Sequence, residues 1–204
     1  RSNLLRSISH DLRTPLTGII GASAAIEENG ESIGVKETRK LAADIHEDAE
    51  WLLRMVENLL SVTRVSQTAE LKKSEEAAEE VIVEAVSRCK KRFPDAQIRV
   101  DLPEEDMLFV PMDATLIVQV LINLMENAVR YAQTPIDIGL RRDGDVAEFS
   151  VRDFGPGIPE EKKQQLFDSV QAQPDSRRGG LGIGLTLCRS IISAHGGTIW
   201  EVNH

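Results

Sequence analysis

The chain of 204 residues is poor in cysteine, in aromatic residues and in long apolar runs. Its two cysteines, Cys89 and Cys188, are far apart and have no CxxC or Cys/His spacing, so we expect buried thiols in a reducing compartment rather than a disulfide or a zinc site. No run of about 18 apolar residues occurs, and the first residues lack the apolar core of a signal peptide. We therefore expect a soluble chain that makes no direct contact with a membrane. This expectation is compatible with the chain being part of a larger protein.

Positive charge is also scarce. The chain carries 24 Lys and Arg against 33 Asp and Glu, which gives a formal net charge of −9. A balance of this sign repels phosphate backbones and excludes general nucleic-acid binding, so any polyanion must be bound at a local site. Apolar residues make up 41% of the chain, which is enough for the cores of two small domains or one large one.

Apolar residues at heptad spacing predict a helical hairpin in the first third of the chain. The first seam, in a helix over residues 4–29, consists of Leu5, Ile8, Leu12, Pro15, Ile19, Ala22 and Ile26. After a helix stop at Asn29-Gly30 the second helix begins near Glu37, and its seam consists of Ile45, Ala49, Leu52, Val56 and Leu59. Two helices alone bury too little surface, so we expect a homodimer in which two hairpins form a four-helix bundle.

Pro15 lies inside the first of these helices, five residues after His10. Proline cannot donate a hydrogen bond to the carbonyl of Asp11, and its ring crowds that carbonyl, so we expect the helix to bend beside the histidine. A bend at this position predicts a hinge in the bundle.

A polar stretch over residues 66–80 marks a domain boundary, which we place near Thr68, so that the domains are residues 1–68 and 69–204. The second domain shows helical spacing in EEVIVEAVSRC, over residues 114–132 and in LGIGLTLCRSIISAHGG, and strand patterns in QIRVDL, MLFV and TIWEV. IDIGLRR and DVAEFSVRD alternate like the arms of a hairpin around a two-residue turn at Asp143-Gly144, in which both residues would need positive φ. The pattern predicts an α+β layer with helices on one face of a sheet.

One polar motif of this domain lies on a predicted helix. Asn123, Asn127 and Arg130 stand at i, i+4 and i+7 on one face, while Leu and Ala residues cover the rest. An amide oxygen can ligate Mg²⁺ alongside phosphate oxygens, and an arginine can neutralise phosphate. A solvated helix face is an equally good interpretation of this motif taken alone.

Two glycine-rich stretches follow. In DFGPGIP, Gly155 and Gly157 allow a tight turn close to a ligand, and Asp153 can accept a hydrogen bond from an exocyclic amine, although an ordinary loop has the same composition. In RRGGLGIGL the glycines lead into a helix start, whose backbone amides can bind an anion. A polar loop rather than a strand precedes them, which argues against a Rossmann dinucleotide site.

Five motifs, HDLRTPLT, NLMENAVRY, DFGPGIP, LF and GLGIGL, occur in the order found in the bacterial two-component sensor histidine kinases, which this chain resembles over nearly its whole length. The resemblance implies an all-α dimerisation and phosphoacceptor hairpin, followed by a Bergerat-type α+β sandwich that binds ATP and Mg²⁺ and lacks its last strand. It implies autophosphorylation of a histidine, phosphotransfer to an aspartate of a response-regulator receiver domain, and phosphatase activity. It places the chain in the cytoplasmic portion of a membrane-anchored bacterial sensor.

The resemblance also implies roles for residues of the hairpin. His10 would accept the γ-phosphoryl group, Asp11 would act as its orienting base, and Thr14 would position water during dephosphorylation of the partner. Neighbours on a helix point about 100° apart, so Asp11 need not bond His10 directly, whereas Thr14 at i+4 shares the face of His10.

For the nucleotide, the resemblance implies a binding set in the second domain. Its members are Asn123, Asn127, Arg130, Tyr131, Asp153, Gly155, Gly157, Gly180, Gly182 and Gly184. Asn127 would ligate Mg²⁺ with support from Asn123, Arg130 would meet phosphate, Tyr131 would lie against the nucleotide, and Asp153 would read the adenine amine. The first two glycines would shape the adenine pocket, and the last three would border the phosphates under a mobile lid.

Two other functions are compatible with the nucleotide motifs. An ATP-hydrolysing clamp of the gyrase or chaperone type has the same nucleotide fold, but it places a glutamate four residues before the magnesium asparagine, where this chain has Asn123, so hydrolysis would lack its base. A binding module with weak or lost kinase activity would bind nucleotide without phosphoryl transfer. The chain also has Val170 where the family often has a second phenylalanine after the one matching Phe167, which predicts weaker anchoring of the lid.

Overall fold

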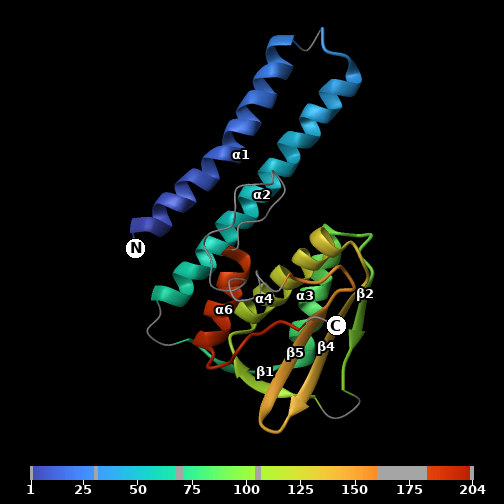
Figure 1. Cartoon of the computed structure of the whole chain (residues 1–204). Helices are drawn as coiled ribbons and strands as arrows, with labels where there is room; N and C mark the ends of the chain where they lie inside the picture. Colours follow the sequence, from blue (N-terminus) through green and yellow to red (C-terminus); the bar gives the residue numbers. More distant parts are fainter. Residues whose placement is uncertain (1, 30–31, 68–70, 104–106, 160–182, 203–204) are drawn as a thin grey trace. The chain divides into compact units, whose positions relative to one another are not determined.

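The computed structural model describes residues 2–29, 32–67, 71–103, 107–159 and 183–202 (Figure 1). Side chains are described within these ranges from residue 12 onward, except at positions 59, 61–67 and 183. The chain divides into two compact units, Arg1–Ser61 and Val62–His204, and each is described by itself. Among the described residues, no helix combines the length and the hydropathy needed to cross a membrane.

The first unit is the predicted helical hairpin. Helix α1 (Ser2–Asn29) and helix α2 (Val35–Gln67) run in opposite directions, and Gly18 of α1 lies against the Asp48 side chain of α2 (Figure 1). The α1 helix continues through Pro15, which is buried. Outside the predicted seam, Leu16 and Ile20 keep 47% and 65% of their surface exposed, so the hairpin presents apolar side chains to solvent.

Two sheets form the β-structure of the second unit. Strands β1 (Ser74–Ala77) and β3 (Phe109–Met112) pair antiparallel. The other sheet has the order β2-β4-β5, in which β2 (Ile98–Asp101) is parallel to β4 (Ile136–Asp143), and β4 is antiparallel to β5 (Val146–Arg152). The sequence pattern did not predict β1, because its residues SEEA are mostly polar and only Ala77 is buried.

Helices cover one face of the three-stranded sheet. They are α3 (Ala78–Arg92), α4 (Ala114–Asn127), the π-helix η1 (Ala128–Ala132) and α6 (Ile183–Ala194), and α4 packs against both α3 and α6. The buried side of β4, formed by Ile136, Ile138 and Leu140, belongs to the same core as these helices, and the alternate residues of β5 pack against that core. The predicted α+β architecture is confirmed.

The turn between β4 and β5 differs from the prediction by one residue. Asp143 pairs with Val146, so the central residues are Gly144 and Asp145 rather than Asp143 and Gly144. Gly144 has a φ of +58°, whereas Asp145 is not among the described residues with positive φ. A turn with glycine at the first central position needs positive φ only there, and it fits the twist of a hairpin as well as the predicted type does.

Two further predictions about elements are corrected. Residues 114–132 are not one regular α-helix, because the last five form η1. The segment TIWEV, predicted as a strand, has no strand pairing within residues 198–202, and its Trp200 and Val202 are 59% and 60% exposed. Ile199 packs against the core, but strand propensity alone does not make the segment a strand when it pairs with no neighbouring strand.

Candidate functional site

Helix α4 carries the first polar motif. Its start is fixed by Asp113, whose Oδ1 accepts a hydrogen bond from the Leu116 N–H at 3.1 Å, as expected of an N-cap residue. The apolar face of the helix, including Leu121 and Met125, lies in the core. Because this apolar face is packed in the core, the polar residues of the last two turns point towards α3, towards α6 or towards the end of the helix.

Asn123 is buried at 8% exposure and links α4 to α6. Its Oδ1 accepts a hydrogen bond from Gln119 Nε2 at 3.2 Å, and its side chain also hydrogen bonds with the Cys188 thiol of α6. The alternative interpretation of the motif, a solvated helix face, therefore does not hold at this position. Asn123 holds two helices together and is not available as an open ligand.

Asn127 is the last residue of α4 and is half-buried. Within the described part of the chain, its side-chain amide has no hydrogen-bond partner, in contrast to Asn123. A half-buried amide without a protein partner can give its oxygen to a ligand.

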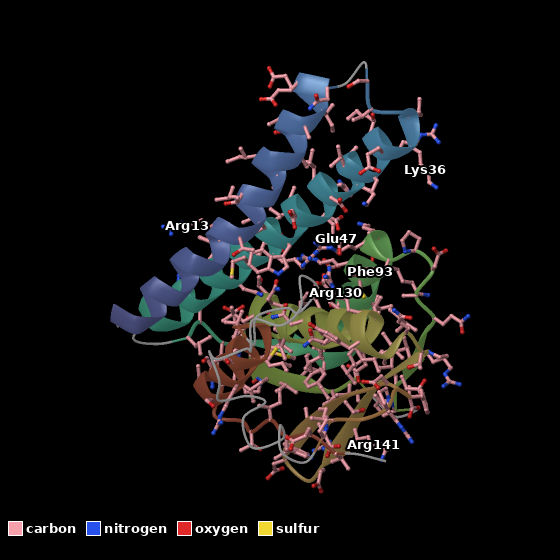
Figure 2. The ribbon with its side chains drawn as sticks, turned by 45° about the horizontal axis from the view of Figure 1, so that its top comes forward. Arg13, Lys36, Glu47, Phe93, Arg130 and Arg141 are labelled. Atoms are coloured by element: carbon pink, nitrogen blue, oxygen red, sulfur yellow. The ribbon has the colours of Figure 1, made fainter. Side chains whose placement is uncertain are left out.

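The π-helix changes the position of the residues that follow Asn127. In a π-turn the N–H bonds five residues back, so each turn is wider than in an α-helix, and the α-helical spacing that put Arg130 at i+7 on the predicted stripe does not apply within η1. The Arg130 guanidinium lies 5.9 Å from the centroid of the Phe93 ring (Figure 2), and Tyr131 is 56% exposed. Single-turn π-helices are frequent at functional sites, which agrees with this place in the chain.

The loop after β5 carries Asp153, Gly155 and Gly157. Asp153 is exposed, and its Oδ1 accepts a hydrogen bond from the Gly155 N–H at 2.9 Å. A Cβ on Gly155 would stand 2.8 Å from the Cβ of Ala132, so only glycine allows this loop to approach the end of η1. Gly157 has a φ of +74°, which also favours glycine. The structure thus brings the DFGPG loop to the helix end that follows Asn127.

For the remaining predicted residues, the structure gives the position of some and does not describe others. Gly184 lies in the first turn of α6, whereas Gly180, Gly182 and the lid residues Phe167 and Val170 lie outside the described residues. His10 and Asp11 are part of α1, and their side chains are not among those described. Thr14 is exposed on α1, one turn after His10.

A buried ion pair beside Asn127 was not predicted from the sequence. Glu126 is 6% exposed, and its Oε1 accepts a hydrogen bond from Arg92 Nη1 at 2.9 Å. Arg92 ends α3, where it follows Lys90 and Lys91. Two features of the sequence could have indicated this ion pair: a carboxylate in an otherwise apolar helix, and the basic residues at the end of α3. A buried charge is normally paired with a group of opposite charge.

Both cysteines are free and buried, as predicted. Burial raises the pKa of the Cys188 thiol to about 12, although the hydrogen bond with Asn123 opposes this shift. Burial and the neighbouring Glu126 carboxylate raise the pKa of Cys89 to about 11. Neither thiol is a nucleophile at neutral pH, because the thiolate is the reactive form.

Comparison with known proteins identifies the family. One family model, the His Kinase A (phospho-acceptor) domain, matches residues 1–68, and a second, the histidine kinase-, DNA gyrase B-, and HSP90-like ATPase, matches residues 112–204. A nucleotide-free crystal structure of the catalytic domain of histidine kinase ThkA is 30% identical, with a TM-score of 0.58, over 66% of this chain and 89% of that chain. The chain belongs to the histidine kinase family. The ATPase domain indicates that this histidine kinase uses ATP.

Three other proteins are similar to this chain over all or nearly all of its length. The sensor protein KdpD of Clostridium acetobutylicum is 46% identical over 100% of this chain and 23% of its own, and KdpD of Escherichia coli K12 is 36% identical over 100% and 23%. The structure of ThkA in complex with the response regulator protein TrrA is 27% identical, with a TM-score of 0.72, over 99% of this chain and 57% of that chain. This histidine kinase chain therefore spans about a quarter of the length of the KdpD proteins it matches.

Proposed function

We propose that this chain is the catalytic core of a sensor histidine kinase that transfers the γ-phosphoryl group of ATP to His10 and then to an aspartate of a response regulator. The observation that carries the proposal is the order of the two matched domains in one chain, a phospho-acceptor domain followed by an ATPase domain. In the first step a nitrogen of His10 forms a bond to the γ-phosphorus, and the bond from that phosphorus to the ADP oxygen breaks. Neutral imidazole is a suitable nucleophile near physiological pH, and Asp11 orients the ring and accepts its proton.

The residues around the end of α4 fit a nucleotide with Mg²⁺. Described residues include no cluster of three or more His, Cys, Asp and Glu that could hold a metal by themselves. Mg²⁺ commonly takes one or two protein oxygens together with phosphate oxygens and waters, and the amide of Asn127, which has no hydrogen-bond partner among the described residues, can supply one such oxygen. Bound Mg²⁺ would neutralise charge on the phosphates, while Asn123 keeps α4 fixed against α6.

Other residues of the predicted set complete the proposed site. Arg130 meets phosphate, and Tyr131 lies against the nucleotide. Asp153 accepts a hydrogen bond from the adenine amine, in a pocket shaped by Gly155 and Gly157. The backbone amides of Gly180, Gly182 and Gly184, before and within the first turn of α6, border the phosphates.

The structure argues against the hydrolysing clamp. Position 123 is a buried asparagine, and the nearest carboxylate in sequence, Glu126, is buried against Arg92 at 2.9 Å. The Glu126 carboxylate is therefore buried and hydrogen bonded to Arg92, so it is not placed to activate a water molecule. A binding module without phosphoryl transfer is the remaining alternative, and the experiment below separates it from a kinase.

We also propose that the chain acts as a homodimer and that its partner is a receiver domain. The hairpin exposes large apolar side chains that a second copy would cover, among them Leu16, Ile20, Leu53 and Val56. ThkA, which has the same fold, was solved in complex with the response regulator protein TrrA.

Incubation with γ-labelled ATP and Mg²⁺ tests the proposed activity. The wild-type chain is expected to become labelled, whereas His10→Gln lacks the acceptor and Asn127→Ala lacks the proposed metal ligand, so neither variant should be labelled. Equal labelling of all three proteins would contradict the proposal. Binding of ATP by an unlabelled wild type would identify a binding module instead.

A further inference from the structure

We propose that Thr134 is a positioning residue for adenine recognition, which holds the loop after β5 so that the Asp153 carboxylate faces the base. The inference rests on the proposed contact between Asp153 and adenine. Thr134 lies between η1 and β4, and its Oγ1 accepts a hydrogen bond from the Phe154 N–H at 2.9 Å, across 20 residues of sequence. The same hydroxyl lies 3.3 Å from the Pro135 carbonyl oxygen, to which it donates.

The direction of the Asp153 carboxylate depends on the backbone that Thr134 holds. The Gly155 N–H donates to Asp153 Oδ1 at 2.9 Å, so one carboxylate oxygen is occupied and the other remains as an acceptor. The peptide between these two residues includes the Phe154 N–H that Thr134 binds. If this peptide moved, the Gly155 N–H would move with it. The Asp153 carboxylate would then turn, because its Oδ1 is hydrogen bonded to that N–H.

Separate contacts hold the Phe154 side chain. The guanidinium carbons of Arg152 and Arg99 lie 4.9 Å and 5.6 Å from the centroid of its ring, and Arg99 Nε donates to Asp137 Oδ1 at 2.6 Å. These contacts restrain the ring on the sheet side of the loop. They leave the backbone N–H of Phe154 to Thr134.

Thr134 also connects the two ends of the proposed nucleotide site. It stands two residues after Ala132, which Gly155 approaches so closely that a Cβ would lie 2.8 Å from the Ala132 Cβ. Ala132 is the last residue of the π-helix that begins directly after Asn127. Through this segment, Thr134 fixes the position of the proposed adenine acceptor relative to the proposed metal ligand.

Calorimetric titration of the full chain with ATP and with ITP, each with Mg²⁺, tests this role. ITP has the same triphosphate but presents a carbonyl where adenine has its amine. We expect Thr134→Val, which keeps the shape and removes the hydroxyl, to raise the Kd for ATP about three- to tenfold, the range of one lost hydrogen bond, and to change the Kd for ITP little. Thr134→Ser keeps the hydroxyl and should restore the preference for ATP.

Two further variants separate the possible outcomes. Thr115→Val, at an exposed position in the first turn of α4, is the matched control and should leave both Kd values unchanged. Equal weakening of ATP and ITP in Thr134→Val, an unchanged preference, or no rescue by serine would overturn the positioning role. Asp153→Asn tests the proposed contact between Asp153 and the adenine amine. If this variant keeps the preference for ATP over ITP, Asp153 does not recognise adenine. Loss of the preference in Asp153→Asn but not in Thr134→Val contradicts only the role of Thr134.

Discussion

At the scale of single residues, three polar groups of the second unit have a hydrogen-bond partner that is distant in sequence. Asn123 binds the Cys188 thiol, Glu126 binds Arg92, and the Phe154 N–H binds Thr134. The motif spacing predicted which residue types gather near the site, but each partner comes from another element. Such pairs depend on how the elements pack, so single-sequence reasoning about spacing did not find them.

Cys188 gives a prediction about stability at alkaline pH. Its pKa in the folded chain is raised from 9.0 to about 12, so the folded state disfavours the thiolate and the unfolded state accepts it. This contribution to stability is fully present below pH 9 and is lost as pH rises from 9 towards 12. At pH 10 the loss is on the order of 1 kcal/mol of unfolding free energy for one such group.

Urea unfolding at pH 7 and pH 10 measures this contribution. The free energy of unfolding should fall more steeply with pH in the wild type than in Cys188→Ala, since the variant lacks the titrating thiol. The free energy of unfolding of the wild type at pH 7 is the reference value for both proteins. Parallel slopes for the two proteins would refute the raised pKa of Cys188.

Thr14 gives a prediction about dephosphorylation. It is exposed on α1, one turn from His10, and its hydroxyl is proposed to position water for hydrolysis of the phosphoryl group on the receiver aspartate. Thr14→Ala should keep autophosphorylation and slow the loss of phosphate from the response regulator. Single-turnover decay of the labelled regulator with each protein is the measurement, and Thr17→Ala, three residues further along the helix, is the control. An unchanged lifetime of the phosphorylated regulator would count against this role.

At the scale of elements, Cys188 and His195 both join α6 to α4. The Cys188 thiol donates to the Val120 carbonyl oxygen at 3.8 Å and contacts Asn123, and His195 lies just after the end of α6. His195 Nε2 accepts a hydrogen bond from the Asp113 N–H at 3.0 Å, and Nδ1 lies 2.8 Å from the Ile191 carbonyl oxygen. A backbone N–H can only donate, so the ring proton is on Nδ1. Lys73 Nζ also donates to the His195 carbonyl oxygen at 2.9 Å.

His195→Ala is therefore expected to weaken the attachment of α6 to the start of α4. The loss of one hydrogen bond and of packing should lower the free energy of unfolding by about 1–3 kcal/mol, and amide exchange at Asp113 should become faster. His195→Gln retains a side-chain acceptor and should lose less. His46→Ala is the matched control, because that side chain is 77% exposed on α2. Unaltered exchange at Asp113 in His195→Ala would show that the ring is not the acceptor.

The elements differ in how well the sequence predicted them. The long periodic segments gave α1, α2, α3 and α6 correctly, because their apolar faces repeat over several turns. The strand β1, the π-helix η1 and the register of the turn at Gly144 were not predicted. Each depends on a few hydrogen bonds at one place in the chain rather than on a repeated apolar pattern. The bend expected at Pro15 stays a prediction.

At the scale of the whole molecule, the chain combines two proposed tasks. The first unit presents the phospho-acceptor helix, and the second carries the proposed nucleotide site at the end of α4 and the loop after β5. The order of the motifs in the sequence predicted this division of labour, because each motif belongs to one domain. The boundary near Thr68 stays a proposal.

Identification of the phosphorylated residue after reaction with ATP and Mg²⁺ tests the central claim most directly. A phosphoryl group on a histidine nitrogen is lost in acid and retained in base, whereas an ester on serine or threonine survives acid. We predict an acid-labile phosphoryl group that peptide mapping at alkaline pH places on His10, and its absence from a His10→Gln variant that still binds ATP. An acid-stable group, a group on another residue, or release of inorganic phosphate without labelling of the chain would contradict it.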